Sequence, residues 1–277
     1  MEKGEGMSIY KHHERNAKRI FFLSVIVWII VAIGLVMEYK KGMLFTSKKE
    51  NLKLIGVILP AFGLLIYSFI EKRRSKMLKQ ENYNIETFEL LEQQKFVVRK
   101  EVGIFQVITY FGLDGNTVGF LKEEYDFVIQ SVWQAVLSFL FKGLHKQQFY
   151  LYNQSGERLL RVQKKMGVRN FYIFSNVDGE KLGELKQVLS LKKWEWIFLG
   201  SDGKEFGKVT GDFSATMQKI EWRDGTHIDV KEDGIPLEAV KYFSASGGSL
   251  VTASISERAE LPRAVYYSVS AIVTIKN

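Results

Sequence analysis

Basic side chains gather in one part of this chain. Residues 142–193 hold 11 Lys and Arg against four acidic residues, whereas the segments 81–141 and 194–277 carry net charges of −5 and −3. Two clusters within this stretch form the candidate site: Lys164, Lys165, Arg169, Lys192 and Lys193. Lys and Arg attract phosphate-bearing groups, so the pattern indicates contact with anionic lipid headgroups or another anionic partner. The alternative is a set of solvated loop lysines without a ligand.

Motifs for other chemistry are missing from the sequence. The chain has no Cys, which excludes disulfides and thiolate chemistry. It has no Gly-x-Ser-x-Gly, no Gly-x-x-x-x-Gly-Lys and no His-Glu-x-x-His. The densest acidic group has the spacing of two hairpin turns and not of a calcium loop: Asp224, Asp229, Glu232 and Asp233. We therefore predict no enzyme activity, no metal site and no cofactor.

Tight turns are the strongest structural signal. Five of the eight aspartates precede a glycine: Asp114, Asp178, Asp202, Asp224 and Asp233. A type I′ hairpin turn needs positive φ at both central positions, which Gly adopts freely and Asp tolerates, so we expect type I′ turns here. Gly156, Gly179, Gly203 and Gly225 fall 23, 24 and 22 residues apart, the length of two strands and two turns. The sequence thus predicts a closed or nearly closed antiparallel sheet built from repeated hairpins.

This repeat also positions the basic clusters. Its Asp-Gly turns share one barrel end, and the intervening turns, which carry the two clusters, share the other, so we predict a basic rim there. Strand signals begin near Phe96, with a strand through Val102–Ile108. We expect further strands at Phe149–Tyr152, Arg158–Val162, Phe171–Phe174, Lys181–Gln187, Trp194–Leu199, Glu205–Val209, Ile220–Arg223, His227–Val230 and Leu237–Phe243.

The first 80 residues have a different character. Ile20–Met37 and Leu54–Ile70 are uncharged runs of 18 and 17 residues, each about long enough to cross ~30 Å of hydrocarbon as a helix. We predict two transmembrane helices, at about 20–37 and 54–70, over buried helices of a soluble core. Residues 1–19, 38–53 and 71–80 hold five Lys and Arg each, so ten lie outside the pair against five between. This asymmetry predicts a cell-membrane protein with both termini in the cytoplasm.

Charge differs sharply between the two parts of the chain. Residues 1–80 carry 15 basic and 6 acidic side chains, whereas residues 81–277 carry 24 and 25. The net +8 of the chain therefore belongs to the membrane anchor, and we predict no nucleic-acid partner. His12 and His13 lie in this basic region, where we expect solvated side chains. We divide the chain into an anchor (1–80), a connector with a short helix at Ile85–Gln94 (81–95) and an all-β domain (96–277).

Two apolar segments interrupt the strands. Phe127–Phe141 has polar residues at four-residue spacing, which predicts a helical insertion at about 125–143. Such a helix packs against the sheet or lies on the membrane surface. The run 264–275, after Pro262, has no charged residue. It is either a helix enclosed by protein or a last strand rich in Val, Ile and Tyr.

Three units of the repeat carry a resemblance. FYLYNQSGERLLRVQKK, FYIFSNVDGEKLGELKQ and WEWIFLGSDGKEFGKV resemble repeats of tubby-like β-barrels, in particular the LURP-one-related and phospholipid scramblase-like branches. The resemblance covers 149–277, or 96–277 if the Asp114-Gly115-x-x-x-Gly119 unit opens the barrel. It implies about a dozen antiparallel strands around a C-terminal hydrophobic helix, and so favours a helix at 264–275. The chain departs from scramblase-like proteins, whose apolar helix comes last, because its two apolar runs come first.

These inferences combine into one functional prediction. We expect a non-enzymatic binding module: a tubby-like barrel anchored by two spans, which contacts anionic headgroups or a membrane-protein partner. Two alternatives come from other classes of protein. One is a lipid-moving protein, suggested only by the scramblase-like resemblance, and the other is a structural or regulatory subunit of a membrane complex.

Overall fold

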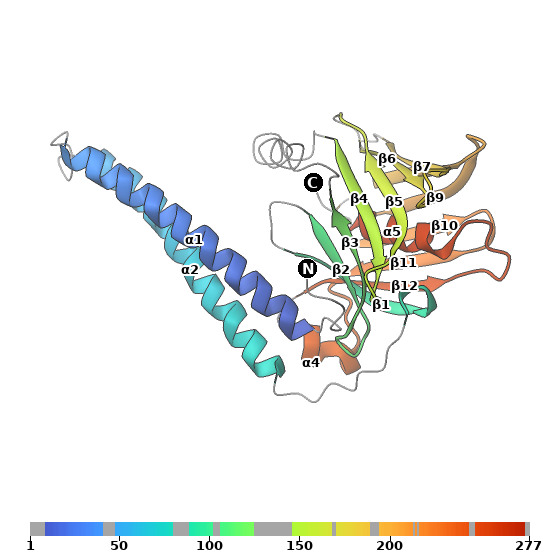
Figure 1. Cartoon of the computed structure of the whole chain (residues 1–277), viewed down its shortest axis with the longest axis horizontal. Helices are drawn as coiled ribbons and strands as arrows, with labels where there is room; N and C mark the ends of the chain where they lie inside the picture. The colour runs from blue at the N-terminus through green and yellow to red at the C-terminus, as the bar shows by residue number, and fades with distance from the viewer. Residues whose placement is uncertain are drawn as a thin grey trace. The chain divides into compact units, whose positions relative to one another are not determined.

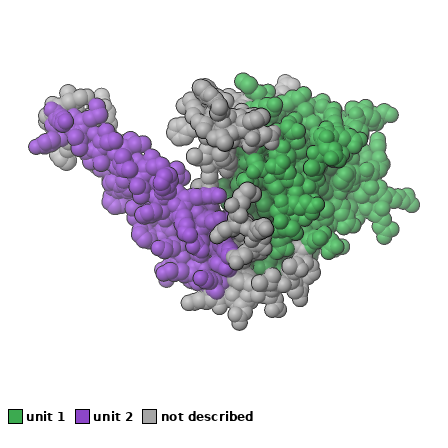
Figure 2. Space-filling model, in the orientation of Figure 1, with its two compact units in different colours: residues 1–8, 83–277 green, residues 9–82 purple. Residues whose placement is uncertain are grey.

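The computed structural model describes most of the 277-residue chain, namely residues 9–40, 48–79, 89–101, 106–124, 146–167, 170–188, 194–212, 214, 216–243 and 247–274. The chain forms two compact units (Figures 1 and 2). Residues 9–82 form the first, which we call the helical hairpin, and residues 83–277 belong to the second, which we call the barrel.

The helical hairpin consists of two long antiparallel helices, α1 (Ile9–Lys40) and α2 (Lys48–Lys79) (Figure 1). Both continue past the uncharged runs that the sequence predicts as spans. Among the described residues, Ile9–Met37 is the one helical stretch long and apolar enough to cross a membrane. The second predicted run lies within α2, which stays helical through Pro60. Length and apolar composition do not show this second run to be a span.

Three serine hydroxyls hold the two helices together at matched levels. Each donates to a backbone carbonyl of the other helix: Ser75 to Tyr10 (3.0 Å), Ser68 to Ala17 (3.0 Å) and Ser24 to Ala61 (3.5 Å). Successive partners are seven residues apart on both helices, which is the heptad step of left-handed helix pairs. Serine and alanine are small, so the helix backbones approach closely, and the three seam hydroxyls are hydrogen-bonded within the hairpin. Large apolar side chains such as Phe22, Ile30 and Phe62 remain on the outside.

An ion pair extends this seam beyond the apolar runs. The Nδ1 atom of His13 lies 2.8 Å from a carboxylate oxygen of Glu71, and Arg74 donates to the other oxygen at 2.9 Å. The expectation of solvated side chains is therefore wrong for His13 and also for His12, which is 1% exposed and bonds Asn16. The sequence placed His13 in a basic tail, whereas α1 begins at Ile9 and turns His13 toward α2.

Twelve antiparallel strands close the barrel in chain order, with β1 beside β12. The strands are β1 (Lys95–Lys100), β2 (Val107–Phe111), β3 (Thr117–Glu123), β4 (Gln147–Asn153), β5 (Arg158–Lys164), β6 (Phe171–Ser175), β7 (Lys181–Val188), β8 (Trp194–Gly200), β9 (Glu205–Gly211), β10 (Met217–Trp222), β11 (His227–Glu232) and β12 (Ser249–Ser254). The predicted all-β antiparallel barrel is confirmed. Closure removes every exposed strand edge, which protects the sheet from pairing with other chains.

The turns at one barrel end share a geometry that differs from the predicted type I′. The Gly115 N–H donates to the Gly112 carbonyl (3.0 Å), and the Gly112 N–H donates to the Asn116 carbonyl (2.8 Å). Equivalent bonds close the turns around Gly156, Gly179, Gly203 and Gly225, and each of these five glycines has φ between 77° and 93°. The preceding Asp or Ser keeps negative φ, so each loop is a three-residue type I turn followed by a glycine bulge.

Aspartate has another use in these turns. A carboxylate oxygen of Asp202 accepts the Lys204 N–H at 3.0 Å, and Asp224 accepts the Thr226 N–H at 2.8 Å. The residue before Gly thus closes the turn from its side chain, and its own φ needs no special value. Asp233-Gly234 is different, because it follows β11 at the opposite end of the barrel, and Asp233 itself has φ 54°.

Strand prediction succeeds along most of the repeat and fails at its flanks. Leu237–Phe243 is not a strand: it forms a 3-10 turn, η2 (Leu237–Ala239), and a short helix, α4 (Val240–Phe243), whose Phe243 ring packs 5.9 Å from Phe111. The strands β3 and β12 have no counterpart among the predicted strands. The short helix of the connector appears as a 3-10 turn, η1 (Leu90–Glu92). Residues 102–105 of the first predicted strand and the insertion at 125–143 lie outside the described residues.

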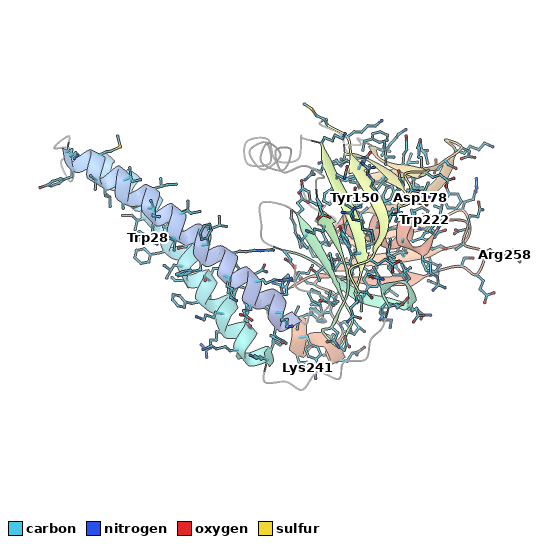
Figure 3. All side chains as sticks on the ribbon, viewed as in Figure 1. Trp28, Tyr150, Asp178, Trp222, Lys241 and Arg258 are labelled. Carbon is cyan, nitrogen blue, oxygen red and sulfur yellow. The ribbon has the colours of Figure 1, made fainter. Side chains whose placement is uncertain are left out.

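The barrel is filled by helix α5 (Arg263–Val273), whose residues 264–273 are all buried. Its rings pack against rings from the barrel wall: Tyr266 lies 4.7 Å from Trp222, and Tyr267 lies 5.1 Å from Phe96. Figure 3 shows Trp222 within the barrel. The predicted C-terminal helix is confirmed, and the rival interpretation as a strand is wrong, because only a helix satisfies its own backbone inside a closed sheet.

Candidate functional site

The described residues of the basic clusters, Lys164 and Lys165, lie at the barrel end opposite the turns around Gly115, Gly156, Gly179, Gly203 and Gly225, which we call the distal end. Strand β5 ends there at Lys164, and the turn to β6 contains Lys165. Arg169, Lys192 and Lys193 of the predicted rim are outside the described part of the chain. Strand order therefore agrees with the predicted division of the turns between two ends.

Lys164 does not lie on the surface, so its place in the predicted rim is a correction. Its exposed fraction is 0%. It follows Leu160 and Val162 on the inward face of β5, because side chains two residues apart in a strand point the same way. Burial lowers the pKa of its ammonium group, an effect that Glu123 opposes and Lys100 reinforces. The position near a turn suggested a solvated side chain, but strand parity turns it inward.

Lys165 is exposed, as predicted, and forms part of a small aromatic and basic patch. Its ammonium nitrogen lies 4.5 Å from the centre of the Phe171 ring, and that of Lys186 lies 5.0 Å from the same ring. The next residue, Met166, is 80% exposed. Two cations beside an aromatic ring and an apolar tip suit a surface that meets phosphate groups above hydrocarbon.

Polar side chains form an inner layer at the distal end that the sequence analysis did not identify. Glu123, Gln147, Lys164 and Gln218 are buried, and register places them beside inward-facing residues of neighbouring strands. Gln218 donates to the carbonyl of Val273 at 3.2 Å, and Glu123 accepts the Gln106 N–H at 2.8 Å. The layer thus meets the C-terminal end of α5, where unpaired carbonyls carry partial negative charge. Alternation within QQFYLYN was the available signal, because Gln147 shares a face with Phe149 and Leu151.

A second polar cluster lies on the outer face of β3–β5. The Tyr152 hydroxyl donates to Glu124, and Arg158 bonds both the hydroxyl and the carboxylate, at 3.0 and 3.2 Å. The Arg158 guanidinium also lies 4.2 Å over the Tyr150 ring, which Figure 3 shows on the barrel wall. Burial, followed by the bond to Glu124, raises the pKa of Tyr152 to about 12. Tyr152 is therefore held in its protonated form between Glu124 and Arg158 on the barrel wall.

Within the described segments, no group of three His, Asp or Glu side chains is arranged to hold a metal ion. The acidic residues that the sequence analysis weighed for calcium are separated by the structure. Asp224 serves the turn between β10 and β11, whereas Glu232 ends β11 and Asp233 follows it at the distal end. The prediction that this spacing reflects turns agrees with the strand order.

Comparison of the chain with protein-family models, with curated proteins and with solved structures gives no match. The tubby-like resemblance therefore rests on the repeat residues, and function has to be argued from the geometry.

Proposed function

We propose that this protein is a membrane-anchored, non-enzymatic binding module whose barrel contacts anionic headgroups, or a partner protein, at the membrane. One observation carries the proposal. The helical hairpin pairs three serine hydroxyls with backbone carbonyls along an internal seam and leaves large apolar side chains outside, which is the arrangement that a bilayer favours. In water the same surface would be a large exposed apolar patch.

The second span belongs to this proposal. Residues 54–70 of α2 run beside the uncharged stretch of α1, and the bond between Ser24 and Ala61 joins the two runs directly. The Trp28 and Phe62 rings also meet edge to face at 4.9 Å. A partner that is paired so closely with a membrane span shares its environment. Two spans place both chain ends on the same side of the membrane. The Lys and Arg residues at 1–19 and 71–80, which flank the spans on that side, favour the cytoplasm.

The barrel supports a binding role over transport or catalysis. Its axis is occupied by α5, so it offers headgroups no water-filled path, and its polar distal layer is engaged with that helix. Twelve strands closed around a C-terminal helix also support the proposed tubby-like relationship. We assign the lipid contact to the distal end, with Lys165, Arg169, Lys192 and Lys193, and without the buried Lys164.

A fluorescent probe can test the barrel contact, because the chain has no native Cys. A single Cys replaces Met166 at the distal end or, as a control, Val177 at the Asp-Gly end. Each is labelled with an environment-sensitive dye in full-length protein reconstituted in vesicles. We expect Met166→Cys to show a blue shift with anionic but not neutral lipid, reversed by salt and by changing Lys165, Arg169, Lys192 and Lys193 to Gln. Equal spectra at both positions would favour a protein partner.

Topology has its own test. Single cysteines at Ser47, between the helices, and Ser201, in a barrel turn, can be probed in intact cells with an impermeant thiol reagent. We expect labelling at Ser47 and protection at Ser201. The reverse pattern would place the barrel outside the cell. Release of the protein by alkaline carbonate would contradict the anchor itself.

A further inference from the structure

The helical hairpin carries two basic stripes just beyond its apolar runs. On α1 the stripe is Lys11, Arg15 and Lys18, and on α2 it is Lys72, Lys76 and Lys79. Residues at positions i, i+4 and i+7 line one face of a helix, so each stripe is continuous over about 10 Å. Lys18 is two residues before Ile20, and Lys72 is two residues after Ile70. Both stripes therefore begin at the edge of the hydrocarbon-facing surface.

Seam geometry places both stripes on the same flank of the hairpin. On α1, Lys11 and Lys18 each come one residue after a seam residue, Tyr10 and Ala17. On α2, Lys72 and Lys76 follow Glu71 and Ser75 in the same way. One residue is a rotation of about 100° around a helix. Because the helices are antiparallel, the same rotation on each turns side chains toward the same side of the plane through the two axes.

The electrostatic surroundings of Glu14 agree with this placement. A hydrogen bond from Lys18, 2.8 Å away, lowers the pKa of Glu14, and the charges of Lys79 and Lys11 lower it further. Lys79 belongs to the other helix, so the two stripes act on one point. The Lys18–Glu14 pair is well exposed, and Lys72, Lys76 and Lys79 are exposed as well. Among the described residues, six cations and the carboxylate of Glu14 therefore share this flank, with Lys11 and Arg15 half-buried.

We propose that these six residues, which we call the basic flank, bind the headgroups of anionic phospholipids in the leaflet that faces the chain termini. The inference rests on the proposed two-span anchor and deepens it, because it assigns a lipid site to the hairpin itself. The choice of partner follows from charge. Two helical stripes of cations at the edge of the hydrocarbon-facing surface are complementary to lipid phosphate groups at the same depth. The serine seam keeps the two stripes in register, so the flank does not depend on how the barrel is placed.

The test is the lipid selectivity of the full-length protein. Protein in neutral detergent is offered equimolar phosphatidylglycerol and phosphatidylcholine, and retained lipid is counted by native mass spectrometry. Each basic residue near a charged surface contributes about 5-fold in affinity. We expect the parent to retain mainly phosphatidylglycerol and the triple variant Lys72→Gln, Lys76→Gln, Lys79→Gln to lose at least about ten-fold of that preference.

Two matched variants keep the test sharp. Changing Lys204, Lys219 and Lys231 on the barrel to Gln removes the same charge elsewhere and should leave the preference unchanged. Changing Lys72, Lys76 and Lys79 to Arg keeps the charge and should retain it. An unchanged preference in the triple Gln variant, or none in the parent, overturns the basic flank while the anchor stands. Release of the protein by alkaline carbonate overturns both.

Discussion

The two ends of the barrel use opposite means to hold the same helix. At the Asp-Gly end, the interior positions include aromatic residues and glycines such as Phe174, Phe198, Trp222, Gly183 and Gly207, and α5 is fixed by several direct bonds. The Tyr266 hydroxyl donates to Asp224, and the Tyr267 hydroxyl donates to the Gln93 carbonyl at 2.5 Å. At the distal end the interior also carries the polar side chains Glu123, Gln147, Lys164 and Gln218, and Gln218 bonds the end of the helix. The Asp-Gly end therefore concentrates stability, whereas the distal end presents charge.

A substitution in α5, the helix bonded at both barrel ends, should have the largest effect on the stability of the barrel. Ile272 is 1% exposed, so Ile272→Asp would place an unpaired carboxylate in the core and cost several kcal/mol or force its protonation. We expect loss of a cooperative melting transition for the barrel of the full-length protein in detergent. Val177→Asp, at an exposed turn position, is the control. An unchanged transition for Ile272→Asp would mean that α5 is not required to fill the barrel.

Removing one hydroxyl from each end sharpens the comparison. Tyr266→Phe removes the donor to Asp224 and the acceptor of the Leu261 N–H, and should lower the unfolding free energy by about 1.5–3 kcal/mol. Tyr172→Phe, in the distal half of the interior, should cost less, because its hydroxyl makes no hydrogen bond to another described residue. Chemical denaturation of both variants measures the difference. Equal losses would remove the proposed asymmetry.

The hydrogen bond from Tyr266 to Asp224 also predicts that the stability of the barrel falls at acid pH. Burial opposes ionisation of Asp224, but bonds from Tyr266, Thr226 and Glu260 outweigh it and lower its pKa. A carboxyl group whose pKa falls on folding stabilises the protein above its unfolded value of about 3.9, and this contribution is lost as pH falls through the folded value. The parent should therefore lose more stability than Tyr266→Phe between neutral pH and that acid range. Parallel curves would mean that the bond does not control Asp224.

Glycines at the Asp-Gly end are needed for aromatic packing. A Cβ atom on Gly183 would lie 2.4 Å from the Phe198 ring and 2.6 Å from the Leu199 carbonyl oxygen, so Gly183→Ala should cost about 1–3 kcal/mol. Gly156 has φ +82° and open space around it, so Gly156→Ala meets only backbone strain of about 1–2 kcal/mol. The melting temperatures of the two variants measure the cost of side-chain crowding at Gly183 and of backbone strain at Gly156. A larger loss for Gly156→Ala would contradict close packing at Gly183.

Burial of Lys164 should make the unfolding free energy of the barrel depend on pH in the alkaline range. Its pKa is lowered by burial from 10.5, so between the two values the unfolded chain binds more protons and stability rises with pH. Lys164→Met removes this titration, and its unfolding free energy should rise less than that of the parent as pH increases from 7 toward 10. Lys165→Gln is the exposed neighbour and should keep the slope of the parent. Identical slopes for all three proteins would show that Lys164 stays solvated.

The smallest effects belong to the turns. Asp202→Ala loses the acceptor of the Lys204 N–H and should cost about 0.5–1.5 kcal/mol. Asp178→Ala should be nearly neutral, because Asn176 already accepts the equivalent Glu180 N–H at 2.8 Å. Thermal melts of the pair measure whether the side chain or the Asp-Gly spacing itself matters. A larger loss for Asp178→Ala would contradict this account of the turns.

Local chemistry alone determined much of this protein. The spacing of Gly156, Gly179, Gly203 and Gly225 reflects the length of a hairpin, so it located most strands and divided the turns between two ends. The length of the uncharged run at 20–37 marked α1 as a possible span. These features depend on residues close in sequence, whose conformational preferences act before any packing.

Tertiary contacts decided the rest. Whether 264–275 is a helix or a strand depends on the closed sheet around it, which leaves no edge for a thirteenth strand. Lys164 sits beside Lys165 in the sequence, yet strand parity and barrel closure bury one and expose the other. His13 contacts Glu71, 58 residues away in the sequence, because the heptad seam sets the register of the two helices. Each outcome depends on which distant residues face each other, and only the folded chain determines that.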